Sequence, residues 1–98
     1  MTYSLRFHEL AIKEWQALPE AIKGQLKKKL KERLENPRVP ASALRGLKDG
    51  YKIKLASAGY RLVYQVRDST ITVVVIAIGR RDKNAVYSAA ETRFRNLD

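Results

Sequence analysis

The spacing of hydrophobic residues changes soon after the start of the chain. Hydrophobic and polar residues alternate weakly over residues 3–7, which predicts a short strand. Helical spacing follows, and Pro19 ends this first helix and opens the next one. A second helix is predicted from Glu20 to Glu35, where hydrophobic residues recur at every fourth position. The pair at 36–37, Asn-Pro, ends it, and the short connection predicts that the two helices form an antiparallel hairpin.

A spacing of two returns after an irregular stretch that ends near Gly50. Hydrophobic and basic residues alternate over residues 51–55. After a turn, Leu62, Tyr64 and Val66 alternate with a second set of positions, which are Arg61, Val63, Gln65 and Arg67. Residues 71–79 are nearly all hydrophobic, which predicts a strand in the middle of a sheet. Three strands joined by short turns predict an antiparallel meander, and residues 86–94 predict a short last helix.

Together these elements predict an α+β fold. An N-terminal strand and an antiparallel helix hairpin would pack on a small, mainly antiparallel sheet, with a short C-terminal helix. We expect residues 1–98 to form a single domain, because a chain of 98 residues leaves no room for two ordinary ones. The hairpin is expected to cover one face of the sheet and to leave the other face open to solvent, with Lys52 and Lys54 standing on the open face.

Composition narrows the choice of function. The chain has no cysteine and one histidine, which excludes disulfides, thiol catalysis, cysteine-bound zinc and histidine-pair nucleases; we expect no metal and no cofactor. The net charge of +10 predicts binding to polyanions, most simply nucleic acid, with a solvated basic surface as the alternative. The hydrophobic run at 73–78 is too short to span a membrane, and the N-terminus lacks the hydrophobic segment of a signal peptide. We therefore expect a cytoplasmic protein with no membrane contact.

Basic residues of the predicted strands form the candidate site. Lys52 and Lys54 project to the same side of one strand, about 6–7 Å apart. Antiparallel pairing across the turn would place Arg61 beside Lys54, and Arg80 and Arg81 follow the central strand. We therefore expect Lys52, Lys54, Arg61 and Arg81 to gather as one cationic cluster, with Tyr87 just beyond the sheet.

This pattern leaves alternatives open. A bulge near Gly59 or Gly79 would move either arginine to the other face. A non-catalytic phosphate-binding face and an ordinary exposed strand with edge lysines both fit the alternation. Tyr87 either stacks on a base or packs at the rim of the core.

Several short stretches over residues 3–90 resemble one known family. They are KEW at 13–15, QLKKKL at 25–30, LRG at 44–46, YKIKL at 51–55, GYRLVYQV at 59–66, GRR at 79–81 and VY at 86–87. In this order they resemble the RelE toxins of bacterial type II toxin–antitoxin systems, within the RelE/ParE superfamily. The resemblance implies the RelE-like microbial RNase fold, and only the tail at 91–98 diverges.

The resemblance implies a metal-independent endoribonuclease, an mRNA interferase that inhibits translation. Such a toxin enters the ribosomal A site, where the message's own 2′-hydroxyl attacks the adjacent phosphate. Carried over to this chain, Lys54 is the general base, Lys52 stabilises the developing negative charge and Arg61 holds the scissile phosphate. Arg81 acts as the general acid or supports it, and Tyr87 stacks on a base and orients it.

The resemblance also implies binding partners. Arg45 and Arg80 are expected to make further contacts to RNA. The ribosome, with its rRNA and mRNA, is the expected site of action. A cognate RelB-like antitoxin would wrap the basic surface and displace the C-terminal helix, and operator DNA would be bound only through the toxin–antitoxin complex.

General chemistry limits what these residues do alone. An unperturbed lysine has a pKa of about 10.4 and arginine is effectively always protonated, so both are reluctant proton carriers at neutral pH. We therefore expect low activity on free RNA and a large contribution from the ribosome. Two other functions remain open: a ParE-like gyrase inhibitor, which shares the fold without the RNase chemistry, and a non-catalytic basic nucleic-acid-binding regulator.

Overall fold

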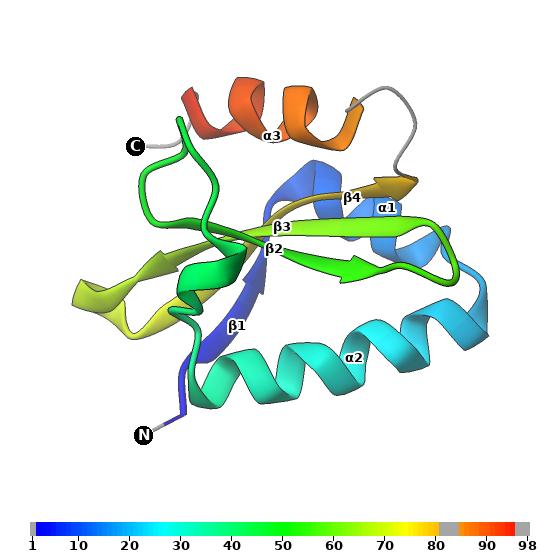
Figure 1. Ribbon diagram of the computed structural model, residues 1–98, viewed down its shortest axis with the longest axis horizontal. Coiled ribbons are helices and arrows are strands. Elements are labelled where there is room, and N and C mark those ends of the chain that lie inside the picture. The colour runs from blue at the N-terminus through cyan, green and yellow to red at the C-terminus, as the bar shows by residue number, and fades with distance from the viewer. Residues whose placement is uncertain (1, 81–84, 96–98) are drawn as a thin grey trace.

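A computed structural model of the chain describes residues 2–80 and 85–95. Its elements follow the predicted order, with a 3-10 turn before the second strand and another between the third and fourth strands. In chain order they are β1 (Ser4–Phe7), α1 (Glu9–Gln16), α2 (Glu20–Glu35), η1 (Pro40–Ser42), β2 (Gly50–Leu55), β3 (Tyr60–Arg67), η2 (Asp68–Thr70), β4 (Thr72–Arg80) and α3 (Ala85–Arg95). The predicted α+β class is confirmed (Figure 1).

The four strands form one sheet in the order β1-β4-β3-β2. β2, β3 and β4 are antiparallel neighbours, as the meander predicted, and β1 pairs with β4 in the parallel sense. β4 therefore lies inside the sheet, which explains its hydrophobic sequence: residues from Thr72 to Ile78 are all buried. One register shift, at Val63/Tyr64, inserts an extra residue into β4 and changes which of its side chains share a face.

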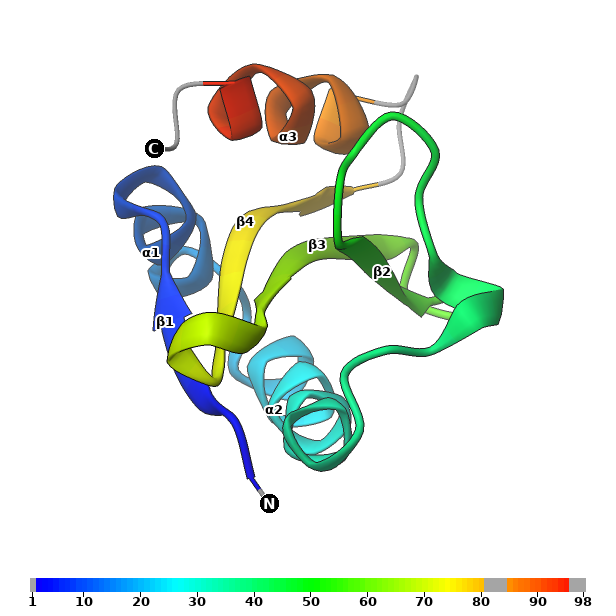
Figure 2. The same cartoon turned by 90° about the vertical axis from the view of Figure 1, so that its left-hand side faces the viewer.

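The helix hairpin covers one face of this sheet. α1 and α2 run in opposite directions, and α2 lies across the sheet from α3 (Figures 1 and 2). Pro19 is the N-cap of α2, and the helix ends at Glu35 before Asn36, as predicted. The hydrophobic stripe of α2 faces the sheet through Leu26 and Leu30, which are 0% and 2% exposed. The core on this side is built from these residues: Ala11, Leu18, Leu26, Leu30, Tyr51, Ile53, Leu55, Leu62, Tyr64, Val66, Val73, Val75 and Ile78.

The opposite face of the sheet is not open to solvent, so this expectation was wrong. α3 packs over it together with the segment before β2, and a second core lies between them. Its buried members are Leu47, Val63, Val74, Ile76, Ala77, Val86 and Ala90. The physical reason lies in β4, which has hydrophobic side chains on both faces and so needs cover on both sides. The basic residues of β2 consequently lie beside this second core rather than on a bare sheet.

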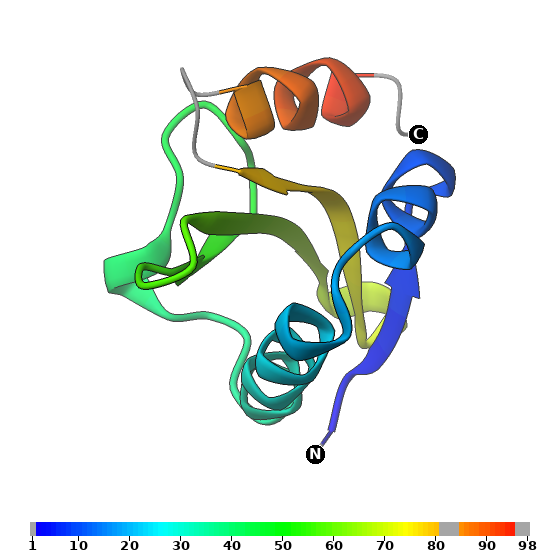
Figure 3. The same ribbon diagram turned by 90° about the vertical axis from the view of Figure 1, so that its right-hand side faces the viewer.

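The segment between α2 and β2 crosses from one layer to the other (Figure 3). It leaves the end of α2, passes the β2 edge of the sheet and rises next to α3. An isolated bridge between Ala43 and Tyr51 gives it a short extended piece, near the position predicted. Gly46 has φ +81°, a left-handed conformation that favours glycine, and this reversal lets Leu47 insert into the second core.

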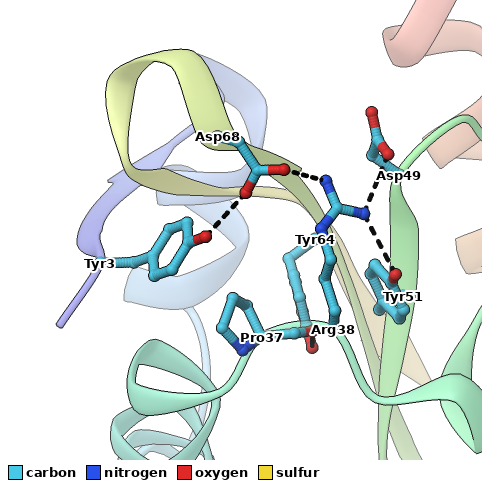
Figure 4. A network of polar contacts seen from close by, with 7 residues as sticks. All are labelled: Tyr3, Pro37, Arg38, Asp49, Tyr51, Tyr64 and Asp68. Atoms are coloured by element: carbon cyan, nitrogen blue, oxygen red, sulfur yellow. Dashed lines mark hydrogen bonds and ion pairs between the residues drawn. The ribbon is translucent and has the colours of Figure 1, made fainter. Parts of the chain in front are cut away.

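Arg38 ties this segment to the turn between β3 and β4 (Figure 4). Its Nη1 donates to Asp49 Oδ1 at 3.0 Å and to the Tyr51 hydroxyl at 3.3 Å, and its Nη2 donates to Asp68 Oδ2 at 2.6 Å. The Tyr3 hydroxyl donates to the other oxygen of Asp68 at 2.7 Å. Since Asp49 has φ +60°, the ion pair holds an otherwise unfavourable backbone conformation in place.

Candidate functional site

The β2–β3 hairpin brings three basic side chains to one place. Lys54 is paired with Arg61, and Lys52 with Val63 of the second core. The alternating neighbours of the lysines belong to the core under α2, so both lysines point to the α3 side of the sheet. The turn at 56–59, with Gly59 at φ +70°, keeps the register intact. Lys52, Lys54 and Arg61 thus form a cationic cluster on one face.

The positive charges of the cluster repel one another, and this repulsion affects the pKa of Lys52. Burial lowers the pKa of Lys52 below its ordinary value, and the nearby charges of Lys54 and Arg61 lower it further. Lys52 is partly buried, whereas Lys54 is exposed. The Lys52 amine is therefore closer to its neutral form than an isolated lysine, and the neutral form is the one that accepts a proton.

Arg61 carries an unused hydrogen-bond donor. Its Nη1 atom is buried and has no hydrogen-bond partner among the described residues. A buried guanidinium donor without an acceptor is costly, and an anionic oxygen is the acceptor that suits it best. The cluster thus has the charge and the free donor that a phosphate group requires.

A cleft of about 210 Å³ lies beside the cluster, between α3 and the segment before β2. It is lined by Leu44, Arg45, Leu47, Lys52, Tyr87 and Glu91. The structure therefore brings Arg45 and Tyr87, which were singled out from the sequence, to the same cleft as Lys52. The mixture of an aromatic ring, hydrophobic walls and two cations suits a nucleotide, whose base stacks and whose phosphate carries charge.

Glu91 is a lining residue that the sequence analysis did not identify. It adds a carboxylate to a cleft whose other charges are positive. The available signal was its spacing: Glu91 comes four residues after Tyr87, so the two share one face of α3. Glu91 also begins the stretch 91–98, which was expected only to be a divergent tail.

Arg80, another predicted residue, lies on the other face of the sheet. Arg80 is paired with Tyr60 at the end of β4, and its guanidinium lies over the Tyr60 ring, 5.6 Å from the centroid. Tyr60 packs against the core under α2, so Arg80 points away from the face that carries Arg61. Arg81 lies outside the described residues.

A partly buried ion pair fixes α3 against the rest of the protein. Arg93 Nη1 and Nη2 donate to the two oxygens of Glu14 in α1, at 2.8 and 3.0 Å, and Nη1 also donates to the Ile76 carbonyl at 2.9 Å. Glu14 in turn accepts the backbone N–H of Ile78 at 3.0 Å. This contact holds the helix that supplies Tyr87 and therefore one wall of the cleft.

The described part of the chain contains neither a cluster of metal-ligating side chains nor a membrane-spanning helix. No three side chains of the types His, Cys, Asp or Glu come together there as a metal site. His8, the single histidine, caps α1 by accepting the backbone N–H of Leu10 at its Nδ1. None of the helices over residues 2–80 and 85–95 is long and hydrophobic enough to cross a membrane.

The chain is similar to known proteins over nearly its whole length. Residues 5–85 match the family described as the ParE toxin of type II toxin–antitoxin systems. The chain is 55% identical over 93 residues to the mRNA interferase toxin RelE of Escherichia coli K12, a match that covers 95% of this chain and 98% of the relative. It is 50% identical over 95 residues to a putative RelE-like toxin protein of Escherichia coli, which covers 97% of this chain and all of the relative.

Solved structures lead to the same family. A mutant RelE toxin of Escherichia coli in the free state aligns with a TM-score of 0.88 at 54% identity, over 95% of this chain and 98% of that one. The toxin in an intact RelBE toxin–antitoxin complex of the same organism aligns with a TM-score of 0.80 at 54% identity, over 83% of this chain and 99% of that one. The chain described here therefore belongs to the RelE and ParE family of toxins from type II toxin–antitoxin systems.

Proposed function

We propose that this protein is an mRNA interferase: a toxin that enters the ribosomal A site and cleaves the message there without a metal ion. The observation that carries the proposal is the Lys52–Lys54–Arg61 cluster with its unpaired Arg61 donor beside the Tyr87 cleft. High identity to proteins named as mRNA interferases supports the same activity. A gyrase inhibitor of the ParE type would need neither a phosphate clamp nor a base-stacking cleft.

The proposed reaction is an internal transesterification. The 2′-oxygen of one nucleotide attacks the adjacent phosphorus, the bond from phosphorus to the 5′-oxygen of the next nucleotide breaks, and the products are a 2′,3′-cyclic phosphate and a 5′-hydroxyl. The 2′-hydroxyl proton passes to a base, and the leaving 5′-oxygen takes a proton from an acid. Charge that develops on the phosphorane oxygens needs stabilisation, and the three reacting atoms must lie in line.

Each residue of the site has a proposed part in this reaction. Lys54 takes the 2′-hydroxyl proton, and Lys52 and Arg61 hold the phosphorane oxygens. Because the pKa of Lys52 is also lowered, we propose that both lysines contribute to the base and the electrostatic role. Arg81 supplies or supports the acid, and Tyr87 stacks on a base of the codon.

Two other arginines are proposed to contact RNA without taking part in the reaction. Arg45 lines the cleft and is proposed to contact the RNA next to the stacked base. Arg80, which is exposed on the other side of the sheet, is proposed to contact RNA only at the periphery. Neither is expected to move a proton.

The ribosome supplies what the cluster lacks. Even a lowered lysine pKa does not provide a strong base at neutral pH, and the open cleft does not by itself force an RNA strand into line. A partner that bends the message raises the rate through orientation, which contributes several kcal/mol in well-positioned reactions. The protein is therefore expected to cut free RNA far more slowly than a message in the A site.

A RelB-like antitoxin is the proposed partner, as in the relatives solved together with RelB. A groove of about 450 Å³ between β1, α1 and α2 fits an amphipathic acidic segment of such a protein. Its floor is hydrophobic and its rim is basic, with Leu5, Phe7, Trp15, Leu30 and Leu34 inside and Lys27 and Lys31 at the edge. Operator DNA would be bound through the antitoxin, and the cytoplasm is the proposed location.

The test is cleavage on programmed ribosomes, with the 5′ ends of the message mapped by primer extension. The wild-type protein should produce cuts within the A-site codon, and Lys54→Ala and Arg81→Ala should bind ribosomes but cut much more slowly. Lys29→Ala is the matched control, because it removes one exposed lysine on α2 far from the cluster. Equal cutting by all three variants would refute the site, and gyrase poisoning with intact message would favour the ParE function instead. Binding without any cutting by the wild type would favour the non-catalytic regulator.

A further inference from the structure

A second basic cleft lies at the far end of the same strands. It has a volume of about 410 Å³ and is lined by Ser4, Arg6, Arg67, Thr70, Thr72 and Val74. Two arginines and three hydroxyl side chains dominate this lining. None of the proposed catalytic residues takes part in it.

The register places this cleft on the same face of the sheet as the cationic cluster. Arg67 is paired with Thr72, and Thr72 with Ser4 of β1, so these three residues form one row across the sheet. Arg6 is paired with Val74, a member of the second core on the α3 side. Along β3, six residues separate Arg61 from Arg67, which corresponds to about 20 Å at ~3.3 Å per residue.

The charge of this cleft is not neutralised within the described residues. Arg67 uses only its Nε, which donates to the side chain of Gln65 at 2.9 Å, and keeps the rest of its guanidinium free for a ligand. Arg6 is exposed and makes no ion pair with another described residue. The acid next in sequence, Asp68, has both oxygens engaged by Tyr3 and Arg38 and so does not offset the arginines (Figure 4).

We propose that this cleft binds a backbone phosphate of RNA, as a second anchor for the strand or duplex whose other phosphate sits at Lys52, Lys54 and Arg61. Guanidinium groups and small hydroxyls are the side chains that most often contact phosphate oxygens in nucleic-acid complexes. The hydroxyls of Ser4 and Thr70 supply neutral donors beside the two charges. This inference depends on the proposed function for the identity of the RNA.

The distance between the two sites sets the length of RNA that reaches both. Neighbouring phosphates of a single strand lie between ~3.4 Å apart in a stacked helix and about twice that distance in an extended strand, so about 20 Å corresponds to about three to six nucleotides. An RNA of about twelve nucleotides would engage both sites, and a dinucleotide with one internal phosphate only one of them. Binding should therefore depend on length, and only the longer RNA should sense the second cleft.

The test is binding of 2′-O-methylated single-stranded RNA, which cannot be cleaved, measured by fluorescence anisotropy over a range of salt. The Arg6→Ala/Arg67→Ala protein should bind the longer RNA about tenfold more weakly, because two solvent-accessible charged contacts to one phosphate are lost. Its slope of log affinity against log salt should be shallower by about 0.7, the value for one phosphate contact on a single strand. Binding of the short RNA should not change. The matched control is Lys28→Ala/Lys29→Ala, which removes the same charge from the exposed side of α2.

The outcomes separate this inference from the proposed function. If Lys52→Ala/Arg61→Ala weakens binding of both RNAs while Arg6→Ala/Arg67→Ala behaves like the control, the second anchor is wrong and the catalytic cluster stands. If only the cleft variant weakens binding, the second anchor stands and the cluster is not the main RNA site. If polyglutamate, but not RNA, loses affinity for the cleft variant, the cleft accepts an acidic protein segment and the inference is overturned. Equal urea midpoints for all variants show that folding is not the cause.

Discussion

Removal of the Glu14 carboxylate should loosen the helix that forms one wall of the cleft. In the folded protein this carboxylate accepts two hydrogen bonds from Arg93 and one from the backbone N–H of Ile78. Glu14→Ala removes all three at once. The Arg93 side chain is only 13% exposed, so its charge does not simply move into water.

The expected loss follows from these contacts. The N–H of Ile78 would be left buried without an acceptor, which costs about 1–3 kcal/mol. The ion pair adds about 1 kcal/mol; this is less than a fully buried pair would contribute, because the Glu14 side chain is 32% exposed. Arg93 keeps its bond to the Ile76 carbonyl, which limits the damage. The total loss in free energy of unfolding should be about 2–3 kcal/mol, a large part of the stability of a protein of this size.

Urea unfolding followed by the fluorescence of Trp15 measures this loss. Glu20→Ala is the control, because the Glu20–Lys23 pair is long, at 3.4 Å, and its carboxylate side is 90% exposed; it should cost less than about 0.5 kcal/mol. The Glu14→Ala/Arg93→Ala double variant should show a coupling of about 1 kcal/mol or more, and the amides of α3 should exchange faster. A Glu14→Ala protein as stable as the Glu20→Ala control would show that this ion pair does not hold α3 in place.

Two further predictions follow from titratable groups. Lys54→Met should raise the pKa of Lys52 towards its ordinary value without restoring it fully, because burial remains while a neighbouring positive charge is lost. NMR detection of the lysine side chains measures this pKa. The control Lys54→Arg keeps the positive charge and should leave the pKa of Lys52 low. An unchanged Lys52 pKa in Lys54→Met would mean that burial and Arg61, and not Lys54, lower it. Hydrogen bonds from Tyr3 and Arg38 hold the pKa of Asp68 below its unfolded value of about 3.9, so its stabilisation is complete above that pH and is lost as pH falls through the folded pKa. Asp68→Asn should therefore lose less stability than the wild type between about pH 6 and pH 3 in urea titrations, and equal losses would contradict the assignment.

Periodicity was sufficient for most of the fold because each element has a clear pattern and a clear end. The bounds of α2 follow directly from its four-residue spacing and from the proline at each side. The cover over the second face was missed, although the hydrophobic run of β4 already required it. The alternation in β2 predicted a sheet with one solvent-exposed face. The local pattern of β2 does not reveal that β4, in the same sheet, is buried on both faces.

The candidate site was predictable only where pairing is local. Lys54 and Arg61 meet across a short hairpin, so strand alternation was enough to place them together. The meeting of Arg45, Tyr87 and Glu91 depends on how α3 and the segment before β2 pack against one another, which no short-range spacing encodes. Arg80 lies on the opposite face from Arg61, since one position along a strand exchanges one face for the other.

Glu14 and Arg93 form an ion pair although they are 79 residues apart in the sequence. β1 likewise pairs with β4, a strand that comes much later in the chain. Contacts of such long sequence separation form late, because the intervening chain must be made and ordered first. During translation, α3 and the wall that carries Tyr87 are made after the β2–β3 hairpin. A nascent chain of this protein therefore holds the basic residues of the cluster before it holds the complete cleft.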